Sequence, residues 1–142
     1  MIKKNFKKIL VPLDGSKNSL RGLDHAIYLA RQCQATLTGI YIMPIYPRSF
    51  SDSIMPYQIV LKKEATKFMN KAKTISAKKG IAFSSKIDYG SPSIDIPNFA
   101  KDKKFDLIVI GSRGYSGIKE TFLGSVANGI VHKSKVPVLV VK

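Results

Sequence analysis

Short apolar runs alternate with amphipathic segments along the chain, and this alternation restricts the fold more than any other feature. Runs rich in Ile, Leu and Val occupy residues 7–13, 36–43, 107–110 and 137–141, and residues 81–87 alternate between apolar and polar side chains. Strands that alternate with helices form a parallel sheet with helices on both faces, joined by right-handed crossovers. The sequence therefore predicts an α/β fold with a doubly wound, five-stranded parallel sheet.

Helix boundaries follow from capping residues and helical periodicity. Ser16 is a predicted N-cap for a helix that runs to about Gln32 or Cys33, because Ser accepts a hydrogen bond from the free N–H groups of a first turn. A second helix is predicted over residues 58–79, with its apolar positions on one side. Gly80 is its predicted C-terminal stop.

Prolines and glycines predict the connections. Residues 44–57, from Pro44 to Tyr57, contain three prolines and three serines without periodicity, which predicts a long loop that is either a functional lid or mobile. Residues 88–90 (Asp-Tyr-Gly) are predicted to turn the chain. Ser91 and Pro92 are a predicted start for a third helix, in which Pro97 either causes a kink or makes the helix restart near Asp95.

Length and composition restrict the class of protein. A chain of 142 residues with 44% hydrophobic residues suits one domain, here residues 1–142. The single Cys33 excludes an intramolecular disulfide and fits a reducing compartment. The basic start MIKKNFKK imitates a signal peptide, but Pro12 and Asp14 interrupt the following apolar run. We therefore expect a soluble, cytoplasmic protein without a membrane span.

The formal net charge of +15, from 24 basic and 9 acidic side chains, has two interpretations. It favours anionic partners such as nucleotides, nucleic acid or acidic surfaces. The basic residues are spread along the chain, few aromatic residues lie between them and no nucleic-acid module is recognisable. The alternative interpretation is a basic, solvated surface.

The stretch from Phe105 to Ser125 predicts an anion site. A buried strand leads into a loop with glycines at 111, 114 and 117, and Gly124-Ser125 opens a helix. Glycines allow backbone N–H groups to approach a phosphate, and the free N–H groups of a helix start add a positive field. Ligands of parallel sheets sit beyond the carboxyl ends of the strands, where the ends at Asp14 and Gly111 are expected to be neighbours.

The glycine spacing distinguishes this site from other phosphate loops. There is no G-x-x-x-x-G-K-[ST] motif and no G-x-G-x-x-G after the first strand. The pattern that is present, Gly111-x2-Gly114-x9-Gly124-Ser125, is similar to the nucleotide-binding signature of the universal stress proteins. KKILVPLDGS, LTGIYI, DYGSPSIDI and the final third of the chain also resemble that family in register.

This resemblance implies a sheet order of 3-2-1-4-5, binding of ATP and a role as a nucleotide-dependent regulator in stress responses. It also implies a homodimer that pairs through the last strand, from Val136 to Val141. An unpaired edge strand rich in Val would otherwise be prone to aggregation. A Mg or Mn ion, if present, would be bound through the ATP phosphates.

The resemblance assigns a base-and-ribose half of the site to the first two strands. Pro12 and Leu13 would lie beside the base. Asp14 would contact the ribose or the adenine. Ile42 would cover the adenine ring.

The phosphate half is assigned to the glycine signature. Gly111 and Gly114 would present backbone N–H groups to the ribose and the α-phosphate. Gly124 and Ser125 would hold the β- and γ-phosphates, and the backbone N–H of Val126 would follow.

Three residues stand at positions where the resemblance is less specific. Arg113 either pairs with a phosphate or faces solvent, and Lys119 is a weaker candidate of the same kind. Tyr41 occupies a position where the family often has histidine, which is expected to change packing more than chemistry.

No residue is placed by the sequence to act as a catalytic base. His25 and His132 fall on predicted helices, and no pair of carboxylates is placed for metal-assisted hydrolysis. We therefore expect slow ATP hydrolysis or none. Two alternatives stay open: a nucleotide-independent protein whose basic face binds nucleic acid or an acidic partner, and a weak ATPase. The preference among ATP, AMP and cyclic AMP is also open.

Overall fold

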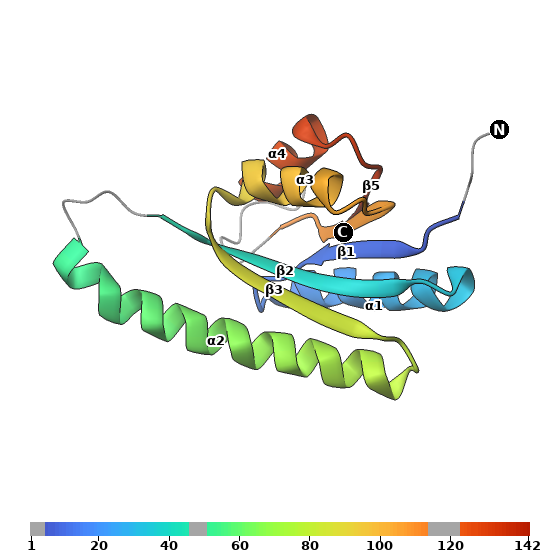
Figure 1. Cartoon of the computed structure of the whole chain (residues 1–142), viewed down its shortest axis with the longest axis horizontal. Helices are drawn as coiled ribbons and strands as arrows, with labels where there is room; N and C mark the ends of the chain where they lie inside the picture. The colour runs from blue at the N-terminus through green and yellow to red at the C-terminus, as the bar shows by residue number, and fades with distance from the viewer. Residues whose placement is uncertain (1–4, 46–50, 114–122) are drawn as a thin grey trace.

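The computed structural model describes residues 5–45, 51–113 and 123–142, in which strands and helices alternate (Figure 1). The elements are β1 (Lys8–Pro12), α1 (Lys17–Cys33), β2 (Thr36–Pro44), α2 (Ser51–Lys78), β3 (Phe83–Gly90), α3 (Pro92–Asp102), β4 (Leu107–Gly111), α4 (Ser125–Lys133) and β5 (Val138–Val141).

The five strands form one parallel sheet in the order β3-β2-β1-β4-β5, which confirms the predicted fold. Strand β1 lies at the centre, next to both β2 and β4. From β1 the chain passes first to β2 and β3 on one side and then to β4 and β5 on the other. The order in which strands are added to the sheet therefore reverses between β1 and β4. A crevice at such a switch point is the usual ligand site of open parallel sheets.

Helices cover both faces of the sheet, α1 and α2 on one side and α3 and α4 on the other (Figure 1). Successive strand residues point to opposite faces, so each strand contributes to two cores. Ile9, Val11 and Val109 are buried in the core on the α1–α2 side, whereas Leu10 and Ile108 are buried in the core on the α3–α4 side. This is why the sequence shows continuous apolar runs in β1 and β4.

The predicted cap of α1 is confirmed. The Ser16 Oγ accepts a hydrogen bond from the Ser19 backbone N–H at 3.1 Å. The helix ends at Cys33, and Gln34 follows in the left-handed conformation with a φ of 56°. Gly80, with a φ of 75°, follows the end of α2 as expected.

Helix α3 begins at Pro92 as predicted, but it is capped differently. The Ser91 side chain makes no capping bond; instead, the Asp95 carboxylate accepts from the Ser91 backbone N–H at 2.8 Å. Pro97 lies buried inside the helix, and the helix continues to Asp102. Of the two predicted alternatives, a kink at Pro97 or a restart near Asp95, the restart does not occur.

Two predicted connections were wrong in part. Residues 51–57, assigned to a long loop, belong to α2, which begins at Ser51. A proline near a helix start removes few hydrogen bonds, so it did not exclude a helix there. Residues 88–90, predicted as a turn, belong to β3 and pair with residues 42–44 of β2. Backbone pairing along the extended β2 outweighs the local turn preference of Asp-Tyr-Gly.

None of the helices in the described ranges has the length and hydropathy needed to cross a bilayer.

Candidate nucleotide-binding site

A cavity of about 300 Å³ lies at the carboxyl ends of β1, β2 and β4, next to the start of α4. Nine of the ten residues predicted for a nucleotide site line it: Pro12, Leu13, Asp14, Ile42, Gly111, Arg113, Gly124, Ser125 and Val126. The tenth, Gly114, lies outside the described residues, as does Lys119. The fold therefore brings together segments that are about 110 residues apart in the sequence.

Eight further lining residues were not assigned to the site from the sequence: Ser19, Ile40, Tyr41, Pro44, Pro92, Ile96, Ile110 and Ala127. Pro92 and Ile96 come from α3. They lie four residues apart and therefore share one face of the helix. The helical spacing does not indicate which cavity that face lines.

One part of the cavity is apolar. Ile40 and Ile42 from β2, Ile110 from β4 and Ile96 from α3 belong to the same buried cluster. Such a wall suits the flat face of a heterocyclic ring, because ring and wall both lose water on contact.

Tyr41 lines the cavity, but its aromatic ring lies in another layer. The ring packs edge to face against Phe68 of α2, with the centroids 5.3 Å apart and the planes at 88°. Ile42, the next residue, belongs to the core on the α3–α4 side. The Tyr41 ring thus joins β2 to α2.

The turn after β1 is held in place by its own polar groups. The Asp14 Oδ1 accepts from the Ser16 backbone N–H at 2.9 Å, and Gly15 between them has a φ of 85°. The Ser19 Oγ donates to the Ser16 carbonyl at 2.9 Å. Asp14 is half-buried, and its Oδ2 has no partner among the described residues. One carboxylate oxygen is therefore left to accept from a ligand hydroxyl or amine.

The exit of β4 packs directly on the first turn of α1. The buried Asn18 side chain accepts from the Arg113 backbone N–H at 2.7 Å through its Oδ1. A Cβ on Gly111 would lie only 2.5 Å from that Oδ1 and 2.8 Å from the Asn18 carbonyl oxygen. Glycine is therefore required at 111 for close packing on α1. The motif predicts the glycine at 111 but not its neighbour Asn18.

Asn18 also has an unsatisfied donor. Its Nδ2 is buried and has no hydrogen-bond partner in the described part of the chain. An unpaired buried amide costs about 1–3 kcal/mol. The Oδ1 bond to Arg113 is the compensating contact that holds this side chain behind the cavity wall.

The start of α4 presents free donors to the cavity. Gly124 is the N-cap, and its own N–H donates to the Ser112 carbonyl at 2.7 Å, which joins α4 to the β4 exit. The first bond within the helix runs from the Asn128 N–H to the Gly124 carbonyl. In the described part of the chain, the N–H groups of Ser125, Val126 and Ala127 have no acceptor. With no acidic residue in this first turn, the helix dipole favours an anion here.

The two histidines lie on helices, as predicted, and neither lines the cavity. His25 is exposed on α1 and hydrogen-bonds to the Arg21 carbonyl, and His132 is exposed in the last turn of α4. Within residues 5–45, 51–113 and 123–142, no three His, Cys, Asp or Glu side chains cluster as metal ligands would. A divalent cation in this cavity would therefore depend on ligands brought by a nucleotide.

Comparison with known proteins identifies the family. The sequence pattern of the universal stress protein family matches residues 5–142. The chain belongs to the universal stress protein family. Its sequence is 37% identical over 150 residues to universal stress protein YxiE of Bacillus subtilis, covering 96% of this chain and 99% of that protein.

Solved structures of this family have the same fold. Universal stress protein UspA from Lactobacillus plantarum superposes with a TM-score of 0.90 at 23% identity, over 99% of this chain and all of that one. A universal stress protein from Archaeoglobus fulgidus in complex with dAMP has a TM-score of 0.72 at 26% identity, over 96% of this chain and 98% of that one. A universal stress protein in complex with cAMP has a TM-score of 0.68 at 26% identity, over 97% and 98% of the two chains.

Proposed function

We propose that this universal stress protein binds ATP in the cavity between β1, β4 and α4 and acts as a nucleotide-dependent regulator of a stress response. The observation that carries the proposal is the composition of the cavity. An apolar wall around Ile42, the Asp14 carboxylate and the free N–H groups at the start of α4 line one space. These are the three surfaces that a base, a ribose and a phosphate chain need.

The phosphate half supports more than a nucleoside as ligand. Ser125, Val126 and Ala127 supply three backbone donors at a positive helix end, and the Arg113 side chain adds a cation at the cavity. Charge-assisted hydrogen bonds of this kind are about twice as strong as neutral ones. Two relatives of similar fold are complexes with dAMP and cAMP, which supports an adenine nucleotide as the ligand class.

The lining also supports a binding role over a catalytic one. Among the described lining residues, the ionisable groups are Asp14, Tyr41 and Arg113, and the Tyr41 ring packs on Phe68. Asp14 is already hydrogen-bonded to Ser16 at the base-and-ribose end. We propose that the bound nucleotide sets the conformation or the assembly of a single-domain protein in the cytoplasm, where ATP is available.

The assembly that we propose is a homodimer formed through β5. This strand is an edge of the sheet, and Leu139 in it is 38% exposed. Val131 of α4, the helix that precedes β5 in the chain, is 41% exposed and is a further apolar side chain open to a partner. Pairing two such edges would satisfy backbone groups that a lone protomer leaves to solvent.

The test is calorimetric titration of the purified protein with ATP, ADP, AMP, cyclic AMP and adenosine, with and without Mg²⁺. We expect ATP to bind more tightly than adenosine, because only ATP reaches the start of α4. Gly124→Val places a branched side chain at that N-terminus and should reduce ATP affinity about tenfold or more, the equivalent of one lost charge-assisted bond.

Asn128→Val is the matched control, because it introduces the same side chain at an exposed position of α4 that does not line the cavity. It should leave ATP affinity unchanged. Absence of ATP binding by the wild type at millimolar concentration would refute the proposal. Steady phosphate release that Gly124→Val abolishes would instead favour a weak ATPase.

A further inference from the structure

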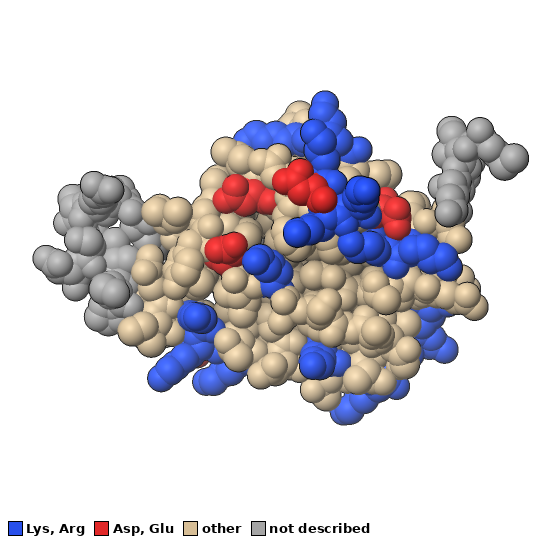
Figure 2. Space-filling view, viewed as in Figure 1, with Lys and Arg blue, Asp and Glu red and all other residues tan. Residues whose placement is uncertain are grey.

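The helices on one face of the sheet carry more net positive charge than the helices on the other face. Helices α1 and α2, which cover that face, together contain nine Lys and Arg against three Asp and Glu, a net charge of +6. Helices α3 and α4 on the opposite face contain two of each, a net charge of zero. In Figure 2 the charged side chains along the lower edge, where α2 runs, are almost all blue, whereas blue and red side chains lie side by side around α3.

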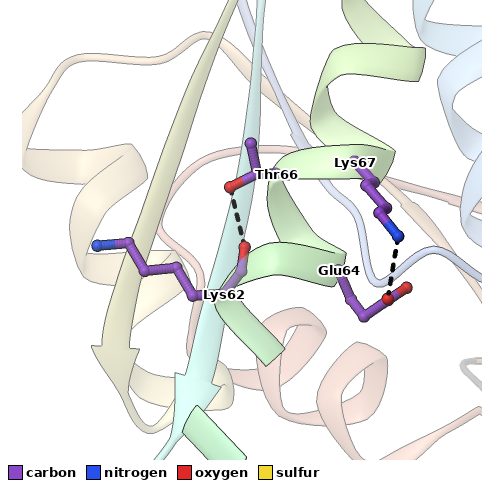
Figure 3. A network of polar contacts seen from close by, with 4 residues as sticks. All are labelled: Lys62, Glu64, Thr66 and Lys67. Atoms are coloured by element: carbon purple, nitrogen blue, oxygen red, sulfur yellow. Dashed lines mark hydrogen bonds and ion pairs between the residues drawn. The ribbon is translucent and has the colours of Figure 1, made fainter. Parts of the chain in front are cut away.

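Most of these cations have no acidic partner. In the described ranges, the only ion pair on α1 and α2 joins Lys67 to Glu64 at 3.6 Å, and both side chains are largely exposed. Figure 3 shows this pair on one side of α2, with the Lys62 ammonium pointing away from it. Like charges held close on one face repel one another, and an anionic ligand would relieve that repulsion.

The α1–α2 face has a groove with basic rims. Lys17 and Arg21 of α1 and Lys71 of α2 line it, and among the described residues its only acidic side chain is Asp24. Leu20 and Ile75, both half-buried, form part of its apolar floor. The groove has a volume of about 360 Å³ and shares no described lining residue with the candidate nucleotide cavity.

The spacing of the cations fits a chain of phosphates. Lys63, Lys67, Lys71 and Lys78 follow one side of α2, with steps of four and seven residues. At 1.5 Å per residue this row is about 22 Å long. A polymer with repeated negative charges can follow such a row, whereas a single small anion contacts only one or two of its members.

An exposed aromatic residue on α1 provides a second feature that a chain of nucleotides would use. Tyr28 of α1 is 64% exposed, and it lies seven residues after Arg21 and eleven after Lys17, on the same side of that helix. Exposed aromatic rings beside basic side chains are stacking platforms for the bases of single-stranded nucleic acids. A purely acidic protein segment would have no comparable use for the ring.

We propose that the α1–α2 face binds single-stranded nucleic acid, with the phosphates along the lysine row and the groove and with a base stacked on Tyr28. The surface would recognise the charge of the phosphates and the flat faces of the bases, and it would therefore have little sequence preference. This function is separate from the proposed nucleotide binding and does not depend on it.

The test measures fluorescence anisotropy of a labelled oligouridine RNA of about 12 nucleotides over a range of salt concentrations. The triple variant Lys17→Ala, Arg21→Ala, Lys71→Ala should bind about tenfold more weakly, and its salt slope should fall by about two, since each lost phosphate contact removes about 0.7. Tyr28→Ala should weaken RNA binding by about fivefold without changing the salt slope.

The matched control is the triple variant Lys101→Ala, Lys103→Ala, Lys133→Ala, which removes the same net charge from exposed positions on the α3–α4 side. It should bind RNA as the wild type does. Equal losses in the two triple variants would show that only net charge matters and would overturn the proposal. So would equal affinity for polyglutamate or phosphatidylserine vesicles, or Tyr28→Ala binding RNA unchanged. Circular dichroism and thermal melting verify that each variant is folded.

Discussion

Replacing Gly111 by alanine tests the packing of the β4 exit on α1. The added Cβ would lie 2.5 Å from the Asn18 Oδ1 and 2.8 Å from the Asn18 carbonyl oxygen, both well inside van der Waals contact. The carbonyl belongs to the backbone of α1 and cannot rotate away, so the strand and the helix must separate. Overpacking of this kind costs about 1–3 kcal/mol. Displacing the Asn18 amide also leaves the Arg113 N–H unpaired, which costs about 1–3 kcal/mol more.

The expected loss for Gly111→Ala is therefore about 2–6 kcal/mol, a large share of the stability of a small domain. The measurement is urea unfolding followed by circular dichroism. With an m-value of about 2 kcal/mol/M, the midpoint should fall by about 1–3 M. Gly80→Ala is the control, because its φ is +75° but nothing lies within 4 Å of the added Cβ. It should cost only the strain of the left-handed conformation, about 1–2 kcal/mol.

A double-mutant cycle identifies Asn18 as the group that clashes. Combined with Asn18→Ala, Gly111→Ala should cost at least about 0.5 kcal/mol less than the sum of the single changes, because the side-chain part of the clash is absent and the Arg113 bond is lost only once. The reasoning is refuted if Gly111→Ala is no more destabilising than Gly80→Ala, or if the two changes are additive.

Three further predictions concern separate parts of the molecule. Asn18→Leu should weaken ATP binding about tenfold but leave adenosine binding unchanged in calorimetry, because it releases Arg113 at the phosphate side; equal losses for both ligands would contradict a positioning role. Ser16→Ala should lower the free energy of unfolding by about 1 kcal/mol in urea, through loss of the α1 cap, and an unchanged midpoint would argue against that cap. Leu139→Lys should convert the proposed dimer to a monomer in light scattering, whereas Lys135→Ala near the same edge should not.

The parts of the fold that local pattern determines were predicted correctly. Continuous apolar runs predicted β1 and β4 because both faces of these strands are buried. Ser16 predicted the start of α1 because its capping hydrogen bond spans only three residues. The errors at residues 51–57 and 88–90 have one cause. Pro, Ser, Asp and Gly indicate local turn preference, but whether a strand or helix continues through them depends on partners elsewhere, as β2 shows for β3.

The candidate site divides in the same way. The resemblance to the universal stress protein family, which rests on the glycine spacing and on segments such as KKILVPLDGS, indicated nine of the lining residues. Ile96 and Pro92 could not be identified in this way, since the sequence pattern of an apolar helix face is the same whichever cavity the face lines. Asn18 also could not be identified, because its partner Arg113 is 95 residues away.

What the sequence determined by itself is therefore the set of strands and helices, the parallel sheet and the glycine spacing of the proposed anion site, all of which depend on period, capping and backbone freedom within a few residues. Only the tertiary structure decided that Asn18 supports the β4 exit, that α3 closes the apolar wall, and that the more basic helices, α1 and α2, share one face of the sheet. These properties depend on which surfaces face each other across the sheet. Long-range packing decides which surfaces these are, because apolar side chains from segments far apart in the chain are buried against one another.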